Sequence, residues 1–445
     1  MTKMLYLALS LLATAVLASC GGKSNSVEPE GFKPSLDADT DCVIKVVGDY
    51  SNFEALEEEA DRFNAYYPNV RLNYVKIDTD LITVLEGKEK PNIFFSHPKM
   101  IGNEQYASVV AHMEDLSDPA LKLNLDSIRS SLLKREGGKV YMVPVFSRTY
   151  GALVNKDLFA KEGLEIPTSW TKLVETCASF RAKGYQSPVM GYTNYDLDKN
   201  KERTKVSNGL QNTIAYPLFV AELAKNPSAL ELAQKSDPAA GEYMRGALET
   251  VKRIFDTGIA NLEECDKITD SYEQVLLRFF EGDVPMMVCN GDTVSGAKKR
   301  EGKSVPFGSN PFSYAFYPMP TTEQGGYFID SPSVQFSVNK NCDNLDMTNE
   351  FMRFLLQTKE LDHLASWKGL ICSTNTTPFA PVYDKDKKTF TPIYDPFNNV
   401  PADRTISPEK IGINDAIATQ IRNASFYVGR GDMSVDEAVQ RYGQL

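Results

Sequence analysis

The most constraining stretch of the chain lies at residues 139–159, where two apolar runs flank a short polar segment. The first run, 140–145, is apolar and β-branched, which predicts a buried strand, and a second short strand is expected at 152–154. The segment between them, Ser-Arg-Thr-Tyr at 147–150, is polar or half-polar. A strand, a polar crossing and a second strand are typical of a chain that passes from one lobe to another. We therefore expect the crossing residues, Arg148 among them, to face a cleft.

The chain starts with a basic residue, Lys3, and an apolar run at 5–17 that ends in Leu-Ala-Ser-Cys-Gly. This run is too short to span a bilayer stably, and its length is typical of a signal-peptide core. The segment before Cys20 resembles a bacterial lipobox, and the resemblance implies export, cleavage before Cys20 and a lipid on that cysteine. An ordinary signal peptide that contains a cysteine is the alternative. We expect the signal peptide to cover residues 1–19.

The next segment, 20–41, is rich in Gly, Ser, Pro, Asp and Glu and has no periodic apolar pattern. This composition predicts a flexible tether behind the lipidated cysteine. No later segment has the length and hydropathy of a transmembrane helix. We therefore expect an extracytoplasmic protein, periplasmic or at the cell surface, that a lipid anchors to the membrane.

Composition excludes some classes of partner and cofactor. The 445 residues carry a formal net charge of −11, and they contain no dense run of Lys and Arg. Phosphate binding needs clustered cations, so we expect no nucleic-acid partner. No Cys-x-x-Cys spacing occurs and the three histidines do not cluster with cysteines, so we predict no zinc site and no cofactor. Cys177 and Cys289 lie in apolar runs and are predicted to be buried free thiols.

The region after the tether opens with a strand–helix–strand pattern. A β-branched run at 42–47 precedes apolar residues spaced by three and four over 53–67 and an alternating run at 70–74. This pattern predicts a parallel sheet with helices on both faces. Loops after the carboxyl ends of such strands bind ligands, and Asp49 and Tyr50 follow the first strand.

Other predicted strands also end in polar loops. The buried run at 91–95 is followed at once by Ser-His-Pro-Lys, and the run at 284–289 by Asn-Gly-Asp. His97 is either a ligand contact or an ordinary surface residue, and the sequence does not decide between these two interpretations. The residues that these two loops contribute are Ser96, His97 and Lys99 for the first, and Asn290, Gly291 and Asp292 for the second.

Neutral polar solutes need several directed hydrogen bonds and one or two aromatic faces. Tyr50, Tyr150, Tyr216 and Trp367 are candidates for those faces. A segment at 327–332, before a predicted strand at 334–338, is interpreted as the return crossing.

The chain resembles the extracellular solute-binding proteins of ABC importers, in the family that includes maltose-binding protein. The resemblance rests on several short motifs that occur in order between residues 43 and 445. They are 43–52; 91–97; Tyr141-x-x-Pro144 with 153–159; Pro167-x-x-Trp170; Phe280-x-Gly282-x-x-x-Met286-Met287 with Asn290-Gly291; 317–320; and 434–438.

The resemblance implies an α/β, two-lobed periplasmic-binding-protein fold of type II, with hinge crossovers. The expected N-terminal lobe is 42–147 plus 332–378, and the expected C-terminal lobe is 148–331 plus 379–445. The residues that match the family's ligand loops or aromatic region are Asp49, Tyr50, Ser96, His97, Lys99, Arg148, Tyr216, Asn290, Gly291 and Asp292. Sugar binders of this kind usually stack the ligand on Trp, whereas this chain has Ser96 and Thr293 where Trp is expected.

The function implied is that of a monomeric binding subunit that captures a small polar solute by hinge closure and delivers it to a membrane permease. Carbohydrate is the family's commonest ligand, and polyols, glycerophosphodiesters and peptides are alternative ligands. Because Arg148 is cationic, a solute with an anionic group is a further alternative. Two other classes are a lipid-anchored glycosidase or esterase, with Asp49 and Asp292 as the paired carboxylates of a glycosidase, and a surface lipoprotein for adhesion or sensing. Gly-x-Ser-x-Gly, Walker A and His-Glu-x-x-His are absent, which favours a binding protein over an enzyme.

Overall fold

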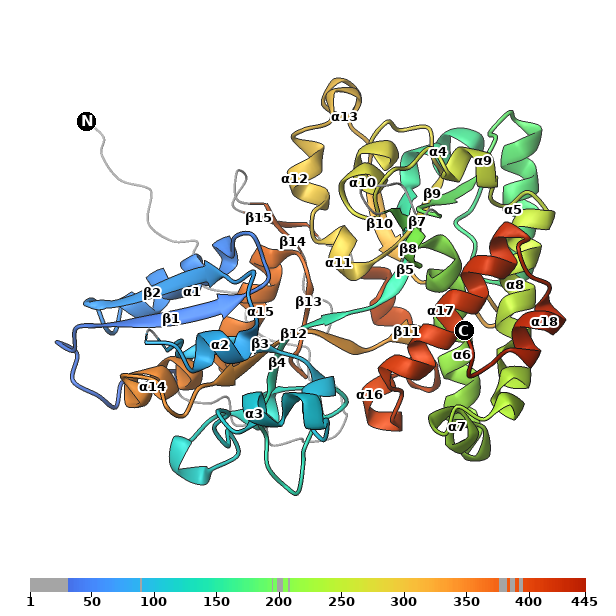
Figure 1. Ribbon diagram of the computed structural model, residues 1–445. Coiled ribbons are helices and arrows are strands. Elements are labelled where there is room, and N and C mark those ends of the chain that lie inside the picture. Colours follow the sequence, from blue (N-terminus) through green and yellow to red (C-terminus); the bar gives the residue numbers. More distant parts are fainter. Residues whose placement is uncertain are drawn as a thin grey trace, which may run out of the picture. The chain divides into compact units, whose positions relative to one another are not determined.

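The computed structural model describes residues 31–88, 90–193, 195–197, 203–206, 209–375, 382–384, 389–391 and 395–445 (Figure 1). The predicted signal peptide and Cys20 lie outside the described residues. Residues 34–445 form one unit, and the description below concerns that unit. Among the helices that the structure describes, none combines the length and the apolar character needed to cross a membrane.

The first sheet has six strands in the order β13-β4-β12-β3-β1-β2. Strand β1 pairs in parallel with β2 and β3, whereas β12 is antiparallel to both β3 and β4. The strands are β1 (Cys42–Gly48), β2 (Val70–Lys76), β3 (Ile93–Ser96), β4 (Val143–Arg148), β12 (Ser331–Val338) and β13 (Ile371–Cys372). The predicted strand–helix–strand opening with a parallel pair is therefore confirmed.

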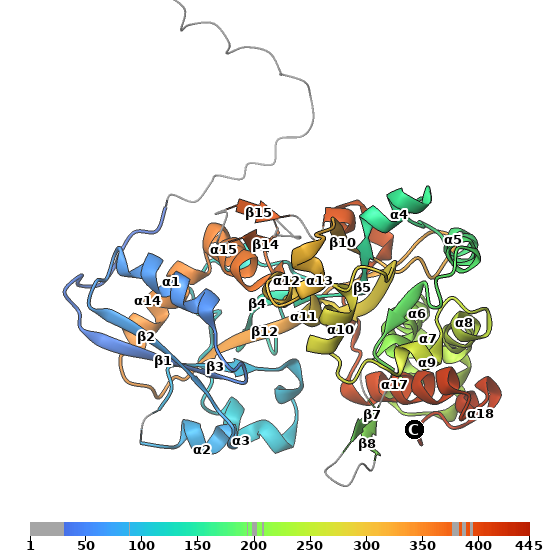
Figure 2. The same ribbon diagram turned by 90° about the horizontal axis from the view of Figure 1, so that it is seen from above.

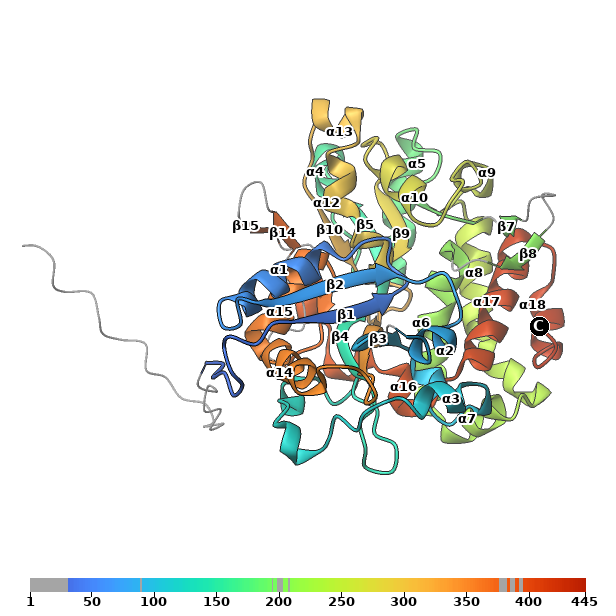
Figure 3. The same cartoon turned by 60° about the vertical axis from the view of Figure 1, so that its left-hand side comes forward.

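Helices cover this sheet on both faces, with α1, α14 and α15 on one side and α2 and α3 on the other (Figure 2). Helix α1 buries Leu56, Ala60 and Phe63 on one stripe, as the spacing of three and four predicts. Figure 3 shows α1 running beside α15, which it contacts. The helices are α1 (Glu54–Asn64), α2 (Leu81–Leu85), α3 (Ala107–Val110), α14 (Leu345–Leu355) and α15 (Thr358–Lys368).

The second sheet has four strands in the order β10-β5-β9-β6. They are β5 (Tyr150–Asn155), β6 (Val189–Gly191), β9 (Met286–Asn290) and β10 (Tyr314–Tyr317). Gly151 in β5 is required by close approach, because a Cβ at this position would lie 2.2 Å from the carbonyl oxygen of Tyr317. Two further strand pairs are β7 (Tyr195–Leu197) with β8 (Arg203–Val206), and β14 (Val382–Asp384) with β15 (Thr389–Thr391).

Most helices of the chain belong with the second sheet, and α6, α8 and α17 pack against one another (Figure 1). Cys177 and Cys289 are buried free thiols in this region, as predicted. The helices are α4 (Lys156–Glu162), α5 (Trp170–Ala182), α6 (Leu210–Lys225), α7 (Pro227–Gln234), α8 (Arg245–Asp256), α9 (Leu262–Cys265), α10 (Glu273–Phe279), α11 (Gly291–Val294), α12 (Ala297–Glu301), α13 (Val305–Ser309), α16 (Pro408–Ile411), α17 (Asp415–Arg430) and α18 (Val435–Gln440).

The chain passes between the sheets at two close crossings. Thr149 alone separates β4 from β5, and Asp330 alone separates β11 (Phe328–Ile329) from β12. Strand β11 pairs in parallel with β16 (Thr405–Ile406), which adds a third segment at the same place. These crossings join the two α/β halves, so the two-lobed solute-binding protein fold with hinge crossovers is confirmed.

The first crossing is shorter than predicted. The strand predicted at 140–145 begins instead at Val143 and continues through Ser147 and Arg148, which were expected in the polar crossing. Tyr150, also expected in the crossing, is the first residue of β5. Strand β4 lies between β12 and β13, with Ser147 opposite Pro332 and Ile371. Because neighbouring strands on both sides bind the backbone here, the strand continues although its side chains become polar.

Candidate functional site

An ion pair joins the two sheets beside the first crossing. Arg148, the last residue of β4, donates from Nη1 to Asp292 Oδ2 at 2.9 Å. Asp292 is the second residue of α11, which directly follows β9. The hydroxyl of Ser333 in β12 donates to the other carboxylate oxygen of Asp292 at 2.6 Å. The charge of Asp292 raises the pKa of the Arg148 guanidinium above its usual value. The side chains of Arg148 and Asp292 are 40% and 35% exposed, so this pair stabilises the fold by only about 0–1 kcal/mol and remains accessible to a solute.

Tyr50 approaches this ion pair from the loop after β1. Its ring packs edge-on against Phe53 and Phe95, with centroids 5.4 and 5.3 Å away. Burial raises the pKa of Tyr50 well above its usual value, and the nearby charges of Asp292 and Asp49 add to this effect. The Lys368 ammonium lies 4.2 Å from the ring centroid, which is cation–π geometry. Tyr50 is thus fixed in orientation by apolar and cationic neighbours.

Tyr150 and Tyr216 form a second aromatic pair, one from β5 and one from α6. Their ring centroids are 5.3 Å apart and their planes are tilted by 54°. Burial raises the pKa of both phenols, and the positive charge of Arg148 acts in the opposite direction on each pKa. The two aromatic faces expected near the crossing therefore lie close to the same arginine.

Asn290 and Gly291 position Asp292. The side-chain Oδ1 of Asn290 accepts from the backbone N–H of Thr293 at 2.9 Å and caps α11. The Gly291 N–H donates to the carbonyl of Thr149 at 2.9 Å, which fastens this turn to the first crossing. The turn therefore places the Asp292 carboxylate opposite Arg148.

The residues of the 91–99 segment occupy different environments. Ser96 is buried inside the first sheet, where its hydroxyl accepts from Ser337 at 2.9 Å. His97 is exposed, and its pKa is lowered by partial burial of the ring and by the charge of Lys99. Lys99 pairs across to Asp415 at the start of α17 at 3.8 Å. Lys99 thus spans from the first sheet's loops to a helix of the second sheet, whereas Ser96 has partners within its own sheet.

Trp367 belongs to a separate cluster. Its indole N–H donates to His363 Nε2 at 3.1 Å, and His363 also binds the buried carboxylate of Glu59 in α1. This arrangement places the indole with the contact between α1 and α15, while the next residue, Lys368, reaches Tyr50. A role for Trp367 in solute binding stays a prediction.

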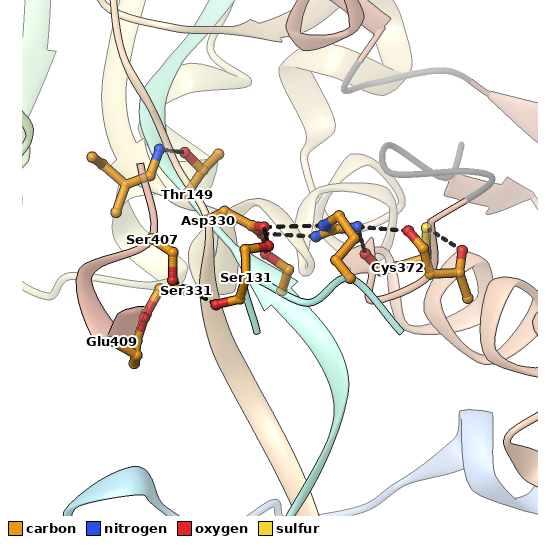
Figure 4. Close-up of polar contacts among 11 residues, drawn as sticks. Ser131, Thr149, Asp330, Ser331, Cys372, Ser407 and Glu409 are labelled. Atoms are coloured by element: carbon orange, nitrogen blue, oxygen red, sulfur yellow. Dashed lines mark hydrogen bonds and ion pairs between the residues drawn. The ribbon is translucent and has the colours of Figure 1, made fainter. Parts of the chain in front are cut away.

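A buried carboxylate, Asp330, organises the return crossing (Figure 4). Asp330 is 1% exposed and accepts from Arg129 Nε and Nη2 at 3.0 and 2.7 Å. The hydroxyls of Ser131 and Ser147 donate to it at 2.7 Å each. Burial alone would raise the pKa of Asp330, but these donors, above all Arg129, outweigh it and lower the pKa.

Further hydrogen bonds link the crossings to each other (Figure 4). The Ile329 N–H donates to the hydroxyl of Thr149 at 3.1 Å, so the two crossings are bonded directly. Ser407, which follows β16, donates from its hydroxyl to the carbonyl of Ser131 at 2.6 Å. All three connecting segments therefore meet in one polar cluster, which we call the waist cluster: Arg129, Ser131, Ser147, Thr149, Ile329, Asp330 and Ser407.

Sequence reasoning did not single out Ser333, Lys368 or Asp330 as functional. Each lies far along the chain from the residues it contacts, so no local spacing could indicate the contact. Among the described residues, no three of His, Cys, Asp and Glu lie together in a way that could hold a metal ion.

Comparisons with known proteins agree with this fold. The model of the family described as bacterial extracellular solute-binding protein matches residues 48–361. No curated protein sequence matches the chain. The solved structure of RafE of Streptococcus pneumoniae in complex with raffinose is 18% identical, with a TM-score of 0.63 over 90% of this chain and 98% of that one.

Two further solved structures share the fold. The GacH receptor of Streptomyces glaucescens, solved unliganded and in complex with acarbose, is 19% identical, with a TM-score of 0.63 over 91% of this chain and 97% of that one. A chitin oligosaccharide binding protein is 16% identical, with a TM-score of 0.64 over 91% of this chain and 98% of that one.

The family match and the fold together define an α/β solute-binding protein with two lobes. The chain belongs to the bacterial extracellular solute-binding protein family. This family consists of binding proteins rather than enzymes, and membership places the folded chain outside the cytoplasm.

Proposed function

We propose that the chain is the binding subunit of an ABC import system and that it captures a carbohydrate between its lobes for delivery to a membrane permease. The observation that carries this proposal is the meeting of Arg148 and Asp292 from the two sheets beside Tyr50, Tyr150 and Tyr216. Hydroxyl groups need directed donors and acceptors, and the apolar face of a sugar ring packs well on aromatic rings.

Hinge closure is the mechanism that we propose. A solute that contacts both sheets only in the closed form shifts the open–closed equilibrium by its difference in affinity for the two forms. The crossings at Thr149 and Asp330 are one residue long, so a small change in backbone angles there would move one half against the other. The proposed lobes are 42–147 with 332–378 and 148–331 with 379–445.

The choice of carbohydrate rests on the site and on the structural relatives. RafE was solved with raffinose and GacH with acarbose, and both share this fold. Within this chain, we assign solute contact to Tyr50, Arg148 and Asp292, and we assign Asn290 to the positioning of Asp292.

Membrane attachment is part of the same proposal. A lipid on Cys20 and the tether 20–41 would keep the folded monomer close to its permease. One lipid-modified cysteine can carry more than one acyl chain, which is what stable anchoring requires.

A thermal-shift screen with mono- and oligosaccharides, polyols, glycerophosphodiesters and peptides tests the function. A ligand that binds only the native state at 100 times its Kd adds about 2.7 kcal/mol to the free energy of unfolding. We expect at least one carbohydrate to raise the melting temperature without being turned over. A shift with a peptide alone, or with no compound, would contradict the proposal.

A further inference from the structure

Glu59, a carboxylate buried on α1, is not part of the site described above. Its side chain is 0% exposed, and its Oε1 binds His363 Nδ1 on α15. The other oxygen, Oε2, has no hydrogen-bond donor among the described residues. Burial raises the pKa of this carboxyl from its ordinary value to about 7, although the hydrogen bond to His363 acts in the opposite direction. A carboxylate that is kept where its charge is unfavourable calls for an explanation.

The hydrogen bonds around His363 fix the position of its ring proton. The indole N–H of Trp367 donates to His363 Nε2 at 3.1 Å. An indole nitrogen is only a donor, so Nε2 is the acceptor and the ring proton lies on Nδ1, which donates to Glu59. The imidazole is therefore neutral. Two hydrogen bonds that point the same way join Trp367, His363 and Glu59, and we call these three residues the Trp–His–Glu link.

A proton that enters the Trp–His–Glu link weakens one of its two hydrogen bonds wherever it binds. On Glu59, it removes the charge that makes the bond from His363 about twice as strong as a neutral one. On Nε2, it sets a ring N–H against the indole N–H, and the bond from Trp367 is lost. Solvent has access to the link through His363, whose side chain is 23% exposed. The link is therefore sensitive to pH in both cases.

The other charges near Glu59 do not remove this sensitivity. Arg62 Nε lies 3.8 Å from Glu59 Oε2, but Arg62 also binds Glu360 at 2.6 Å. The charge of Glu360 adds to the effect of burial on the pKa of Glu59, so two carboxylates share one guanidinium. On α14, which also packs against α1, Glu350 and Arg353 pair with each other at 2.7 Å. Glu59 therefore takes up a proton at a higher pH than an ordinary glutamate does.

The two helices that the Trp–His–Glu link joins both reach Tyr50, and they run side by side (Figure 3). Helix α15 ends at Lys368, the residue after Trp367, and the Lys368 ammonium lies 4.2 Å from the centroid of the Tyr50 ring. Phe53, which directly precedes α1, packs edge-on against the same ring with centroids 5.4 Å apart. A change in the contact between α1 and α15 therefore acts on Tyr50 from two sides.

We propose that the Trp–His–Glu link is a pH-sensitive positioning device: it holds the end of α15 so that Lys368 stays on Tyr50, and a proton taken up by the link weakens solute binding. This inference rests on the proposed function, which assigns solute contact to Tyr50. Because burial raises the pKa of Glu59 to about 7, the proton is bound below that pH and released above it. Solute binding should therefore be tighter on the alkaline side. The coupling is reciprocal, so bound solute should lower the pKa of the link.

Two-dimensional ¹H–¹⁵N NMR of the full chain labelled with ¹⁵N-tryptophan tests the link without any solute. The sequence contains two Trp, so two indole N–H peaks are expected, and Trp367→Phe assigns them. We expect the Trp367 peak to move with pH, with a midpoint of about 7. Glu59→Gln should lower this midpoint by about one pH unit or more, because the ring then titrates without a carboxylate beside it. The matched control, Glu57→Gln at an exposed position of α1, should titrate as the wild type does.

Isothermal titration calorimetry at about pH 6 and about pH 8 measures the effect on binding, with raffinose, maltotriose, xylotriose and chitotriose as the probes. We expect the best probe to bind the wild type at least about fivefold more tightly at the higher pH, the lower end of typical couplings between two sites. Glu59→Gln lacks the charge at every pH, so it should bind at both pH values with the weaker affinity. Glu57→Gln should keep the wild-type difference.

The outcomes separate this inference from the proposed function. A Trp367 peak that does not move with pH overturns the inference whether or not a sugar binds. A pH dependence of the Kd that Glu59→Gln leaves unchanged also overturns it, and carbohydrate binding then stands. If every sugar fails to bind, the proposed function and the coupling to solute both fall. If the urea midpoint shows that Glu59→Gln is unfolded, His363→Gln is the second test, because it removes the titrating ring and should hold the Trp367 peak constant.

Discussion

Replacing Asp330 by Ala should destabilise the protein more than a surface substitution does. The change removes the acceptor of four hydrogen bonds, at 3.0 and 2.7 Å from Arg129 and at 2.7 Å from each of two serines. Among the described residues, the Arg129 charge then keeps the carbonyls of Cys372 and Thr374 as partners, at 2.7 and 3.0 Å. Because Asp330 is 1% exposed and Arg129 only 13%, water cannot replace the lost carboxylate well.

The expected decrease in the free energy of unfolding can be estimated from the general cost of breaking a buried ion pair. Removal of one partner of such a pair costs about 3–5 kcal/mol, since the other charge is left buried and uncompensated. With an m-value of about 3 kcal/mol/M, this loss lowers the urea midpoint by roughly 1 M or more.

Urea unfolding followed by tyrosine and tryptophan fluorescence measures the change. The matched control is Asp256→Ala, because Asp256 pairs with Lys252 in an exposed helix position and is 55% exposed. We expect the control to shift the free energy of unfolding by no more than about 0.5 kcal/mol. An Asp330→Ala protein with the control's midpoint would refute the reasoning that Asp330 compensates the buried charge of Arg129.

Two other predictions follow from the same contacts. The donors lower the pKa of Asp330, so the stability that its carboxylate provides is present above the ordinary aspartate value of about 3.9 and is lost as the pH falls through the lowered pKa. The difference in urea midpoint between the wild type and Asp330→Asn should therefore shrink below about pH 4, and a constant difference down to the lowest pH tested would contradict the assignment. Arg148→Ala should abolish the sugar-induced thermal shift. The melting temperature of the unliganded variant should be nearly that of the wild type, because the Arg148–Asp292 pair is partly exposed. A full thermal shift in the variant would show that Arg148 is not part of the site.

The fold was predictable from the sequence because its governing features are local. The strand–helix–strand opening is a periodic pattern and appears in the structure as expected. The apolar runs on either side of residue 149 also form strands, but the first begins at Val143 rather than at 140 and both strands extend further toward residue 149 than predicted. The extension of β4 as far as Arg148 was not predicted, because it depends on segments that are distant in the sequence. Its hydrogen bonds go to β12 and β13, which lie about 180 or more residues further along the chain.

The candidate site was predictable only where it follows strand ends. Tyr50, Arg148 and Asp292 each end or follow a strand, and the structure brings their charges and rings together. Ser333 and Lys368 gave no such signal, since a serine within a strand and a lysine at a helix end are common on any surface. Their importance appears only when distant segments are placed side by side.

Small-angle X-ray scattering measures whether a bound solute closes the protein. The measurement compares the radius of gyration of the protein alone with that at a saturating concentration of the sugar that gives the largest thermal shift. We expect a smaller radius of gyration with the bound sugar, and the same value as for the protein alone with a sugar that gives no thermal shift. An identical radius of gyration with and without the bound sugar would contradict it.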